Sequence, residues 1–395
     1  MLVVAGPAGS GKSTLGAALA AALGLAPLDL DSVTNPLLDR LAPAVLGTHW
    51  LTGEHAALIR AGRYAALRAV AADLVAAGQG AVLIAPFTEE LQGGSAWREL
   101  LDALAPVRPD VFYLDAAPEL GAARRAVRAA ARDAHRADQP APRPRVGHHR
   151  LDALLTTGQQ VFRVRQALGG RSAVDAENPL FHRRFAAVLF DLDGTLADST
   201  AAVARSWTQL AREYAFDPTA VQANHGQPAG TLLNRLLDPD RIPTALARIQ
   251  ELEIGDTTDI VATPGAADRL ASLPPGRAAV VTSGIRRLAA ARLAAAGLTP
   301  PDVVITRDDV EHGKPDPEPY LTAAARLGVP PHRCLAVEDA AAGIRSARRA
   351  GCAVLAVRGT SEDEELAEAD LIIDSLDLVE IALVDGELRL ARRDR

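Results

Sequence analysis

Residues 187–198 read AVLFDLDGTLAD, an apolar run followed by two aspartates, a glycine and a threonine. Such a run is typical of a strand buried on both faces of a parallel sheet, and the ligands of these sheets bind beyond the carboxyl ends of the strands. Asp191 and Asp193 are therefore predicted to face one reaction centre. One carboxylate is suited to attack a phosphorus atom, while the other protonates the leaving oxygen and later deprotonates water. Because carboxylates so close to a phosphate need a counter-ion, we expect a Mg²⁺ ion between them.

Short apolar runs alternate with longer alanine-rich stretches of helical pattern along the whole chain, which favours a parallel α/β fold. Examples of predicted strands outside this motif are LVVA (2–5), AVLIAP (81–86), VFYLD (111–115), AAVVTS (278–283) and CLAVED (334–339). Glycines, a proline and charges in residues 169–185 interrupt the pattern just before AVLFD begins a new strand. We therefore predict the α/β class with two doubly wound parallel-sheet domains, residues 1–177 and 178–395.

The composition excludes several classes of protein and partner. With 48% apolar and 23% charged residues, the chain is not mainly disordered, collagen-like or coiled-coil. The net charge of −7 makes a nucleic-acid partner unexpected. Cys334 and Cys352 form no CxxC pair, so neither a disulfide framework nor a cysteine zinc site is predicted. No apolar run approaches the roughly 18 residues of a membrane span, and the first residues lack a secretory signal. We expect a cytoplasmic protein without a membrane partner, and the oligomeric state is left open.

The two lysines of the chain are informative because all other basic residues are arginine. Of 42 basic residues, only Lys12 and Lys314 are lysine. A compact ammonium close to a phosphate is not readily replaced by a planar guanidinium. Each lysine lies in a motif suited to phosphate chemistry, and we therefore predict two phosphate-binding sites.

The first motif is GPAGSGKST, residues 6–14, which matches GxxxxGKS and lies between an apolar strand and a helical run. Its glycines allow consecutive backbone amides and a helix N-terminus to face the phosphates of a nucleotide. Lys12 is expected to reach the β and γ phosphates of ATP, and Ser13 to ligate Mg²⁺. The predicted nucleotide-binding residues of the loop are Gly6, Gly9, Ser10, Gly11, Lys12, Ser13 and Thr14.

This half resembles the P-loop small-molecule kinases, the group that contains gluconate and shikimate kinases. The next predicted strand after the loop ends in LDLDS, residues 28–32. In that group an acid after the second strand orients or deprotonates the acceptor hydroxyl, which implies Asp31 as a catalytic residue, with Asp29 as second choice. The alternative is an aspartate that only caps the following helix. Arginines gather in residues 124–150, and the resemblance implies a lid helix that brings arginines, Arg128 foremost, over the transferring phosphoryl group. A solvated basic helix is the alternative here.

The second half resembles the haloacid dehalogenase superfamily of phosphatases, because three more motifs follow DLDGT in the required order. They are VVTSG, HGKPDPEPY and AVEDAAAGI. The resemblance implies that the Ser283 hydroxyl and the Gly284 amide hold the phosphate. Lys314 clamps the nucleophile and the phosphoryl oxygens. Asp339 ligates Mg²⁺, and the neighbouring Glu338 is a further candidate metal ligand.

The same resemblance assigns roles within the first motif. Asp191 is the nucleophile and a metal ligand, Asp193 is the general acid and base and offers its backbone carbonyl to Mg²⁺, and Thr195 belongs to the substrate loop. The helical pattern over about 199–262 resembles the small cap of the subgroup that contains β-phosphoglucomutase and sugar phosphatases. Within it, HGQPAGTLL (225–233) resembles a substrate loop, and His225 is a candidate substrate contact; a packed or solvated histidine is the alternative.

We therefore predict a bifunctional enzyme, a Mg²⁺-dependent phosphatase for a sugar or polyol phosphate fused to an ATP-dependent small-molecule kinase. Its partners would be small phosphate esters and ATP. Two alternatives remain open at this point. One is a polynucleotide end-healing kinase and phosphatase, which the acidic second half and the cap argue against. The other is a phosphatase regulated by an ATP-binding domain that is not catalytic.

Overall fold

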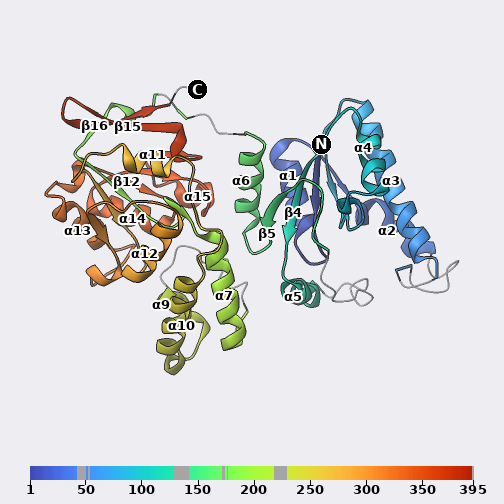
Figure 1. Ribbon diagram of the computed structural model, residues 1–395, viewed down its shortest axis with the longest axis horizontal. Helices are drawn as coiled ribbons and strands as arrows, with labels where there is room; N and C mark the ends of the chain where they lie inside the picture. The colour runs from blue at the N-terminus through green and yellow to red at the C-terminus, as the bar shows by residue number, and fades with distance from the viewer. Residues whose placement is uncertain are drawn as a thin grey trace. The chain divides into compact units, whose positions relative to one another are not determined.

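The computed structural model describes residues 1–41, 50–51, 54–128, 142–170, 174–175, 177–217 and 229–393. They form two compact units, Met1–Leu168 and Gly169–Arg395, which are shown in Figure 1. In the described part of the chain, no helix is both long and apolar enough to cross a membrane.

The first unit is a parallel sheet with helices on both faces. Its described strands run in the order β2-β3-β1-β4-β5. Along β1, Val3 and Ala5 belong to one core cluster, whereas Leu2 and Val4 belong to the other. Alternate residues of the central strand are thus buried on opposite faces, which explains its continuous apolar run. The elements of this unit are β1 (Leu2–Ala5), α1 (Lys12–Leu23), β2 (Ala26–Asp29), α2 (Leu30–Leu41), α3 (Ala56–Ala76), β3 (Ala81–Ile84), α4 (Ser95–Leu104), β4 (Asp110–Asp115), α5 (Pro118–Arg128), β5 (His149–Asp152) and α6 (Thr157–Ala167).

The second unit contains another parallel sheet, in the order β11-β10-β7-β12-β13-β14. The elements of its core are β6 (Arg184–Phe185), β7 (Ala187–Phe190), β8 (Ala197–Asp198), β9 (Val261–Ala262), α11 (Ala266–Ala271), β10 (Ala278–Val281), α12 (Arg286–Ala295), β11 (Val303–Ile305), α13 (Glu318–Arg326), β12 (Cys334–Glu338), α14 (Ala341–Ala350), β13 (Ala353–Val357), α15 (Asp363–Leu366) and β14 (Leu371–Ile373). Phe190 of β7 pairs with Val280 and Val337, so the residues that follow β7, β10 and β12 meet at one edge. The predicted class, two doubly wound parallel α/β sheets, is confirmed.

Three described helices lie between β8 and β9 and form a small cap beside the core of the second unit (Figure 1). They are α7 (Thr200–Tyr214), α9 (Ala229–Leu236) and α10 (Ile242–Gly255). Strands β8 and β9 pair antiparallel, and they join the cap to the core. The cap has a hydrophobic cluster of its own around Trp207, Leu233 and Ile249. It can therefore pack as one body near the edge of the sheet where β7, β10 and β12 end.

The last described residues of the chain form a β-hairpin beside the core of the second unit. Its strands are β15 (Val379–Val384) and β16 (Glu387–Arg392), and β16 also pairs with β6. Asp385 and Gly386 in its turn both have positive φ, 53° and 79°, as the two-residue turn of a hairpin requires. The dipeptide Asp-Gly was the available sequence signal for this turn.

Candidate active sites

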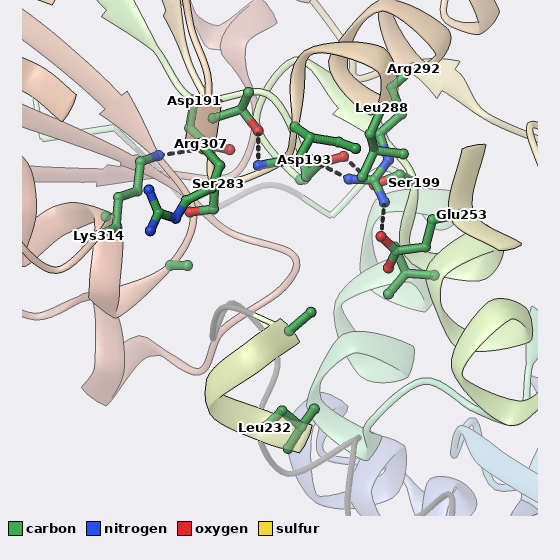
Figure 2. A pocket seen from close by; sticks show the side chains of 18 of the residues that line it. Asp191, Asp193, Ser199, Leu232, Glu253, Ser283, Leu288, Arg292, Arg307 and Lys314 are labelled. Carbon is green, nitrogen blue, oxygen red and sulfur yellow. Dashed lines mark hydrogen bonds and ion pairs between the residues drawn. The ribbon is translucent and has the colours of Figure 1, made fainter. Parts of the chain in front are cut away.

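Lys314 is the centre of the polar cluster at the edge of the second sheet. Its ammonium donates to Asp191 Oδ1 at 2.5 Å, to Glu338 Oε1 at 2.6 Å and to the carbonyl of Val281 at 2.8 Å. Asp191 follows β7 and Glu338 ends β12, so the strand register brings both carboxylates to the lysine. Figure 2 shows Lys314 directed toward Asp191. Lys314 is only 5% exposed, and a buried charge is tolerated when it is paired and hydrogen-bonded in this way.

Glu338 has both carboxylate oxygens engaged by protein donors. Besides Lys314, its Oε1 accepts from the Tyr320 hydroxyl at 2.8 Å, and its Oε2 accepts from the amides of Asp339 and Ala340. Gly343 packs so closely that a Cβ there would overlap the carboxylate. These contacts orient Glu338 toward Lys314, and its expected role as a metal ligand stays a prediction.

Three buried carboxylates of this cluster could hold a metal ion. Oxygens of Asp191, Glu338 and Asp339 lie within 4.8 Å of one another. Burial, together with the charges of neighbouring acids, raises the pKa of Asp339 to about 8 and the pKa of Asp191 well above its usual range, although Lys314 lowers the latter. When all three carboxylates are ionised, the single ammonium of Lys314 does not balance their negative charge. Hard oxygen donors with excess negative charge fit a divalent cation such as Mg²⁺.

Asp193 lies two residues beyond Asp191 and is held by two side chains. The Ser199 hydroxyl donates to its Oδ1 at 2.7 Å, and Nη1 of Arg292 lies 2.5 Å from its Oδ2. Arg292 also lies 3.6 Å from Glu253 Oε2 on cap helix α10. Figure 2 shows the guanidinium between the two carboxylates. The sequence analysis did not single out Arg292, because an arginine in an alanine-rich helix looks like any other arginine in this arginine-rich chain.

The residues of the second unit that were predicted to contact the substrate, Ser283, Gly284 and Thr195, differ in their exposure and hydrogen bonds. Ser283 is exposed and lines the cavity described below, as a phosphate contact requires. The Gly284 amide donates to Thr282 Oγ1 at 3.1 Å. Thr195 is fully buried, and its hydroxyl donates to Asp339 Oδ1 at 3.4 Å. Its described contact is therefore with a candidate metal ligand and not with the cavity.

A cavity of about 530 Å³ lies between the catalytic edge and the cap. The core contributes Asp191, Asp193, Ser283 and Lys314, and the cap contributes residues of α7, α9 and α10. Figure 2 shows Leu232 on the cap side of this space. His225, the predicted substrate contact, lies outside the described residues.

The phosphate loop of the first unit joins β1 to α1. Gly6, Gly9 and Gly11 all have positive φ, and a Cβ at Gly9 would overlap the backbone of Gly121. Only glycine fits such a turn without strain. The Lys12 ammonium donates to the carbonyl of Pro7 at 3.3 Å, within the loop. Ser10 is fully buried in the loop, while Ser13 and Thr14 are exposed in the first turn of α1, where a helix N-terminus favours anions.

Asp29 and Asp31 have different surroundings. Asp29 Oδ1 accepts from the Asp31 amide at 2.9 Å, so Asp29 caps the start of α2. Asp31, in the first turn, forms an ion pair of 2.6 Å with Arg63 of α3. The Arg63 guanidinium also donates to Thr34 and lies 4.6 Å over the ring of Trp50. Arg63 was missed by the sequence analysis, because its separation from Asp31 gives no local signal.

Two arginines of α5 hold the phosphate loop through its carbonyls. Arg124 donates to Ser10 O at 3.2 Å, and Arg125 donates to Ala8 O at 2.7 Å. Arg128, the preferred lid arginine, is the last residue of α5. Its side chain lies outside the described part of the structure, so its role stays a prediction.

Comparison with known proteins assigns each half to a known group. Residues 1–143 match an AAA domain, and residues 185–351 match the haloacid dehalogenase-like hydrolases. Hexitol phosphatase A of Escherichia coli is 40% identical over 199 residues, covering 49% of this chain and 92% of its own. Validoxylamine A 7'-phosphate phosphatase of Streptomyces hygroscopicus is 37% identical, covering 48% and 92%. The structure of CbbY from Rhodobacter sphaeroides with phosphate has a TM-score of 0.45 and 26% identity, covering 49% and 95%. The AAA-domain match confirms the P-loop resemblance of the first half. The match over residues 185–351 and the two curated relatives confirm the resemblance of the second half, and the chain belongs to the haloacid dehalogenase-like hydrolases.

Proposed function

We propose that the second unit hydrolyses a sugar or polyol monophosphate through a phosphorylated Asp191. The observation that carries this proposal is the buried contact between Lys314 and Asp191, braced by Glu338. The ammonium favours the ionised, nucleophilic form of a carboxylate whose pKa burial would otherwise raise further. The named activities of the relatives in Escherichia coli and Streptomyces hygroscopicus support the same reaction class.

The reaction would proceed in two displacements at phosphorus. First, an Asp191 carboxylate oxygen bonds to phosphorus while the ester P–O bond breaks, and the leaving oxygen takes a proton from Asp193. Next, Asp193 takes a proton from water as the water oxygen attacks phosphorus, and the P–O bond to Asp191 breaks. Inorganic phosphate and the alcohol are released. Asp191 is again a carboxylate, and Asp193 is again a carboxylic acid that carries the proton taken from water. Ser283, exposed in the cavity, would hold a phosphoryl oxygen.

Mg²⁺ would be held by Asp191, Asp339 and the backbone carbonyl of Asp193. When bound, it supplies positive charge that offsets the acidic cluster and the phosphoryl oxygens. Thr195 and Thr360 both donate to the Asp339 carboxylate and would fix its direction. Glu338 would act through Lys314.

The charges around the cavity favour a substrate with one phosphate and an uncharged alcohol. Among the described lining residues, the positive side chains are Lys314, Arg292 and Arg307. Lys314 and Arg292 are each paired with two carboxylates. Arg307 donates to the carbonyls of Val310 and Glu311 in its own loop. A second phosphate or a carboxylate on the substrate would therefore find little unpaired positive charge. The polar side chains of Asn234 and Gln250 suit hydroxyl groups.

We also propose that the first unit is an ATP-dependent small-molecule kinase. The geometry that supports this second activity is the glycine turn around Lys12 together with the Asp31–Arg63 ion pair. Asp31 would orient the acceptor hydroxyl, and Arg63 would set its position. A domain that senses a nucleotide without phosphotransfer is the competing proposal for this unit. The alternative of a polynucleotide end-healing enzyme is disfavoured by the cap that lines the phosphatase cavity of the second unit.

The test is a screen of the full-length chain for phosphate release from sugar, polyol and nucleotide phosphates, and for ATP turnover with a panel of acceptors. Asp191→Asn should abolish phosphate release and leave ATP binding unchanged, and Lys12→Ala should do the reverse. Phosphate release that survives Asp191→Asn would refute the phosphatase assignment. ATP binding without turnover on any acceptor would favour the sensing domain.

A further inference from the structure

Arg292 of α12 is a buried arginine that lies between a carboxylate of the core and a carboxylate of the cap. Its side chain is 6% exposed, and its Nη1 and Nη2 face Asp193 of the core and Glu253 of the cap, at 2.5 and 3.6 Å. Its Nε has no hydrogen-bond partner among the described residues. The two carboxylates therefore provide its charge compensation, and Figure 2 shows them on either side of the guanidinium, one from the core and one from the cap.

Glu253 in turn connects the guanidinium to a second cap helix. Its Oε1 accepts from the indole nitrogen of Trp207 on α7 at 3.2 Å, while its Oε2 faces Arg292. Trp207 belongs to the hydrophobic cluster that holds the cap helices together. Movement of the cap away from the core would thus separate Glu253 from Arg292. A guanidinium that has lost one of two buried partners has a different preferred position, because leaving a buried charge unpaired is costly.

We propose that Arg292 is a positioning residue that makes the direction of the Asp193 carboxylate depend on the seating of the cap. With the cap seated, Glu253 holds one side of the guanidinium, and the other side holds Asp193 toward the cavity. With the cap displaced, Arg292 still pairs with Asp193, but Glu253 no longer fixes the position of the guanidinium, and Ser199 is the other described side chain that holds the carboxylate. The proton donor is then oriented only when the cavity is closed around an alcohol. This inference rests on the proposed function in one respect, the assignment of Asp193 as the proton donor.

The kinetic test compares two esters whose leaving groups differ in their need for a proton. A hexitol phosphate releases an alkoxide-like oxygen that needs protonation, whereas 4-nitrophenyl phosphate releases a stable phenolate. General acid catalysis contributes about 10²–10⁴-fold. Arg292→Met should therefore lower kcat/KM for the hexitol phosphate by about 10²-fold, and for the aryl ester by less than about 5-fold. An equal loss for both esters would overturn the proposal in favour of a merely structural role.

Two further variants complete the kinetic design. Glu253→Gln keeps the size of the side chain and an oxygen for Trp207 but removes the charge, so it should produce the same ester-dependent loss at a smaller size, about 10-fold. The double variant with Arg292→Met should be no worse than Arg292→Met alone, because both changes break one linkage. Additive losses would overturn the proposal. Arg287→Met is the matched control, because Arg287 is an exposed arginine on the same helix, and it should change neither ester.

Backbone hydrogen exchange supplies a readout independent of catalysis. Arg292→Met should speed exchange in α10, residues 242–255, relative to Arg287→Met, and leave β12 protected. Unchanged exchange in α10 would overturn the proposal. If β12 also lost protection, Arg292→Met would have damaged the fold. The exchange rate of α10 in Glu253→Gln, compared with that in Arg287→Met, would then decide whether cap and core are linked. If the unmodified chain hydrolysed neither ester, the proposed function would fail, while exchange would still decide whether Arg292 links cap and core.

Discussion

Replacing Lys314 by methionine removes the one ammonium from a buried group of carboxylates. Lys314 donates to Asp191, Glu338 and the carbonyl of Val281, and it is almost completely buried. Methionine fills a similar volume without charge or donors. Removing one partner of a buried ion pair costs about 3–5 kcal/mol of unfolding free energy, because the remaining charge is buried without compensation. In a unit of this size, that corresponds to a fall in Tm of about 6–20 °C.

The size of the loss should depend on pH. Lys314 lowers the pKa of Asp191, so its removal lets that pKa rise further above its value in the unfolded chain. The folded state then keeps a proton that the unfolded state loses, and stability falls as pH rises. Both chains lose stability in this way above the unfolded pKa of about 3.9, because the folded pKa of Asp191 is raised in both. The loss continues to a higher pH in the variant, so the two chains diverge above the folded pKa of the unmodified chain. The destabilisation should therefore be smaller at pH 5.5 than at pH 8.

Calorimetry of the full chain at both pH values, without added metal, measures the effect. Lys12→Met is the matched control, because it removes the other lysine from the phosphate loop of the first unit. It should leave the transition of the second unit unchanged. Adding Glu338→Gln to Lys314→Met should recover part of the loss, because it removes one of the unpaired charges. If Lys314→Met melted within about 1 °C of the unmodified chain at pH 8, the electrostatic account of this cluster would be refuted.

Three other expectations concern the metal, the packing and the kinase site. Burial, with the charge of Glu338, raises the pKa of Asp339 to about 8, so the metal-free fold loses stability as pH rises from about 4 to 8. Mg²⁺ should therefore raise Tm more at pH 8 than at pH 6, and an equal rise at both would contradict this. Gly343→Ala would force a methyl group into Glu338 and should cost about 1–3 kcal/mol in chemical denaturation, whereas Gly62→Ala, a helical site with open space, should be neutral or stabilising. Arg63→Met should raise KM for the phosphate acceptor and leave KM for ATP unchanged; an effect on ATP alone would contradict its assignment.

The strand pattern and the order of the motifs were readable from the sequence because they are local. Continuous apolar runs such as 2–5 and 187–190 become the central strands of the two sheets, since only a strand buried on both faces can be apolar at every position. Strand β5, HRLD, was not anticipated, because it has only one buried side chain and therefore lacks that signal. The glycines of the phosphate loop were also readable, because their positive φ restricts the residue type at each position.

Tertiary structure alone decided which charged side chains meet. Arg292 and Glu253 lie in separate helices of the core and the cap, and Arg63 and Asp31 lie in separate helices of the first unit. In a chain with forty arginines, the residue type says little about which of them is buried against a carboxylate. The engagement of Glu338 by Lys314 and Tyr320 likewise depends on strand register and helix packing. Which charged residues pair over a long sequence separation depends on how the helices and strands pack together, and no local pattern of residues encodes it.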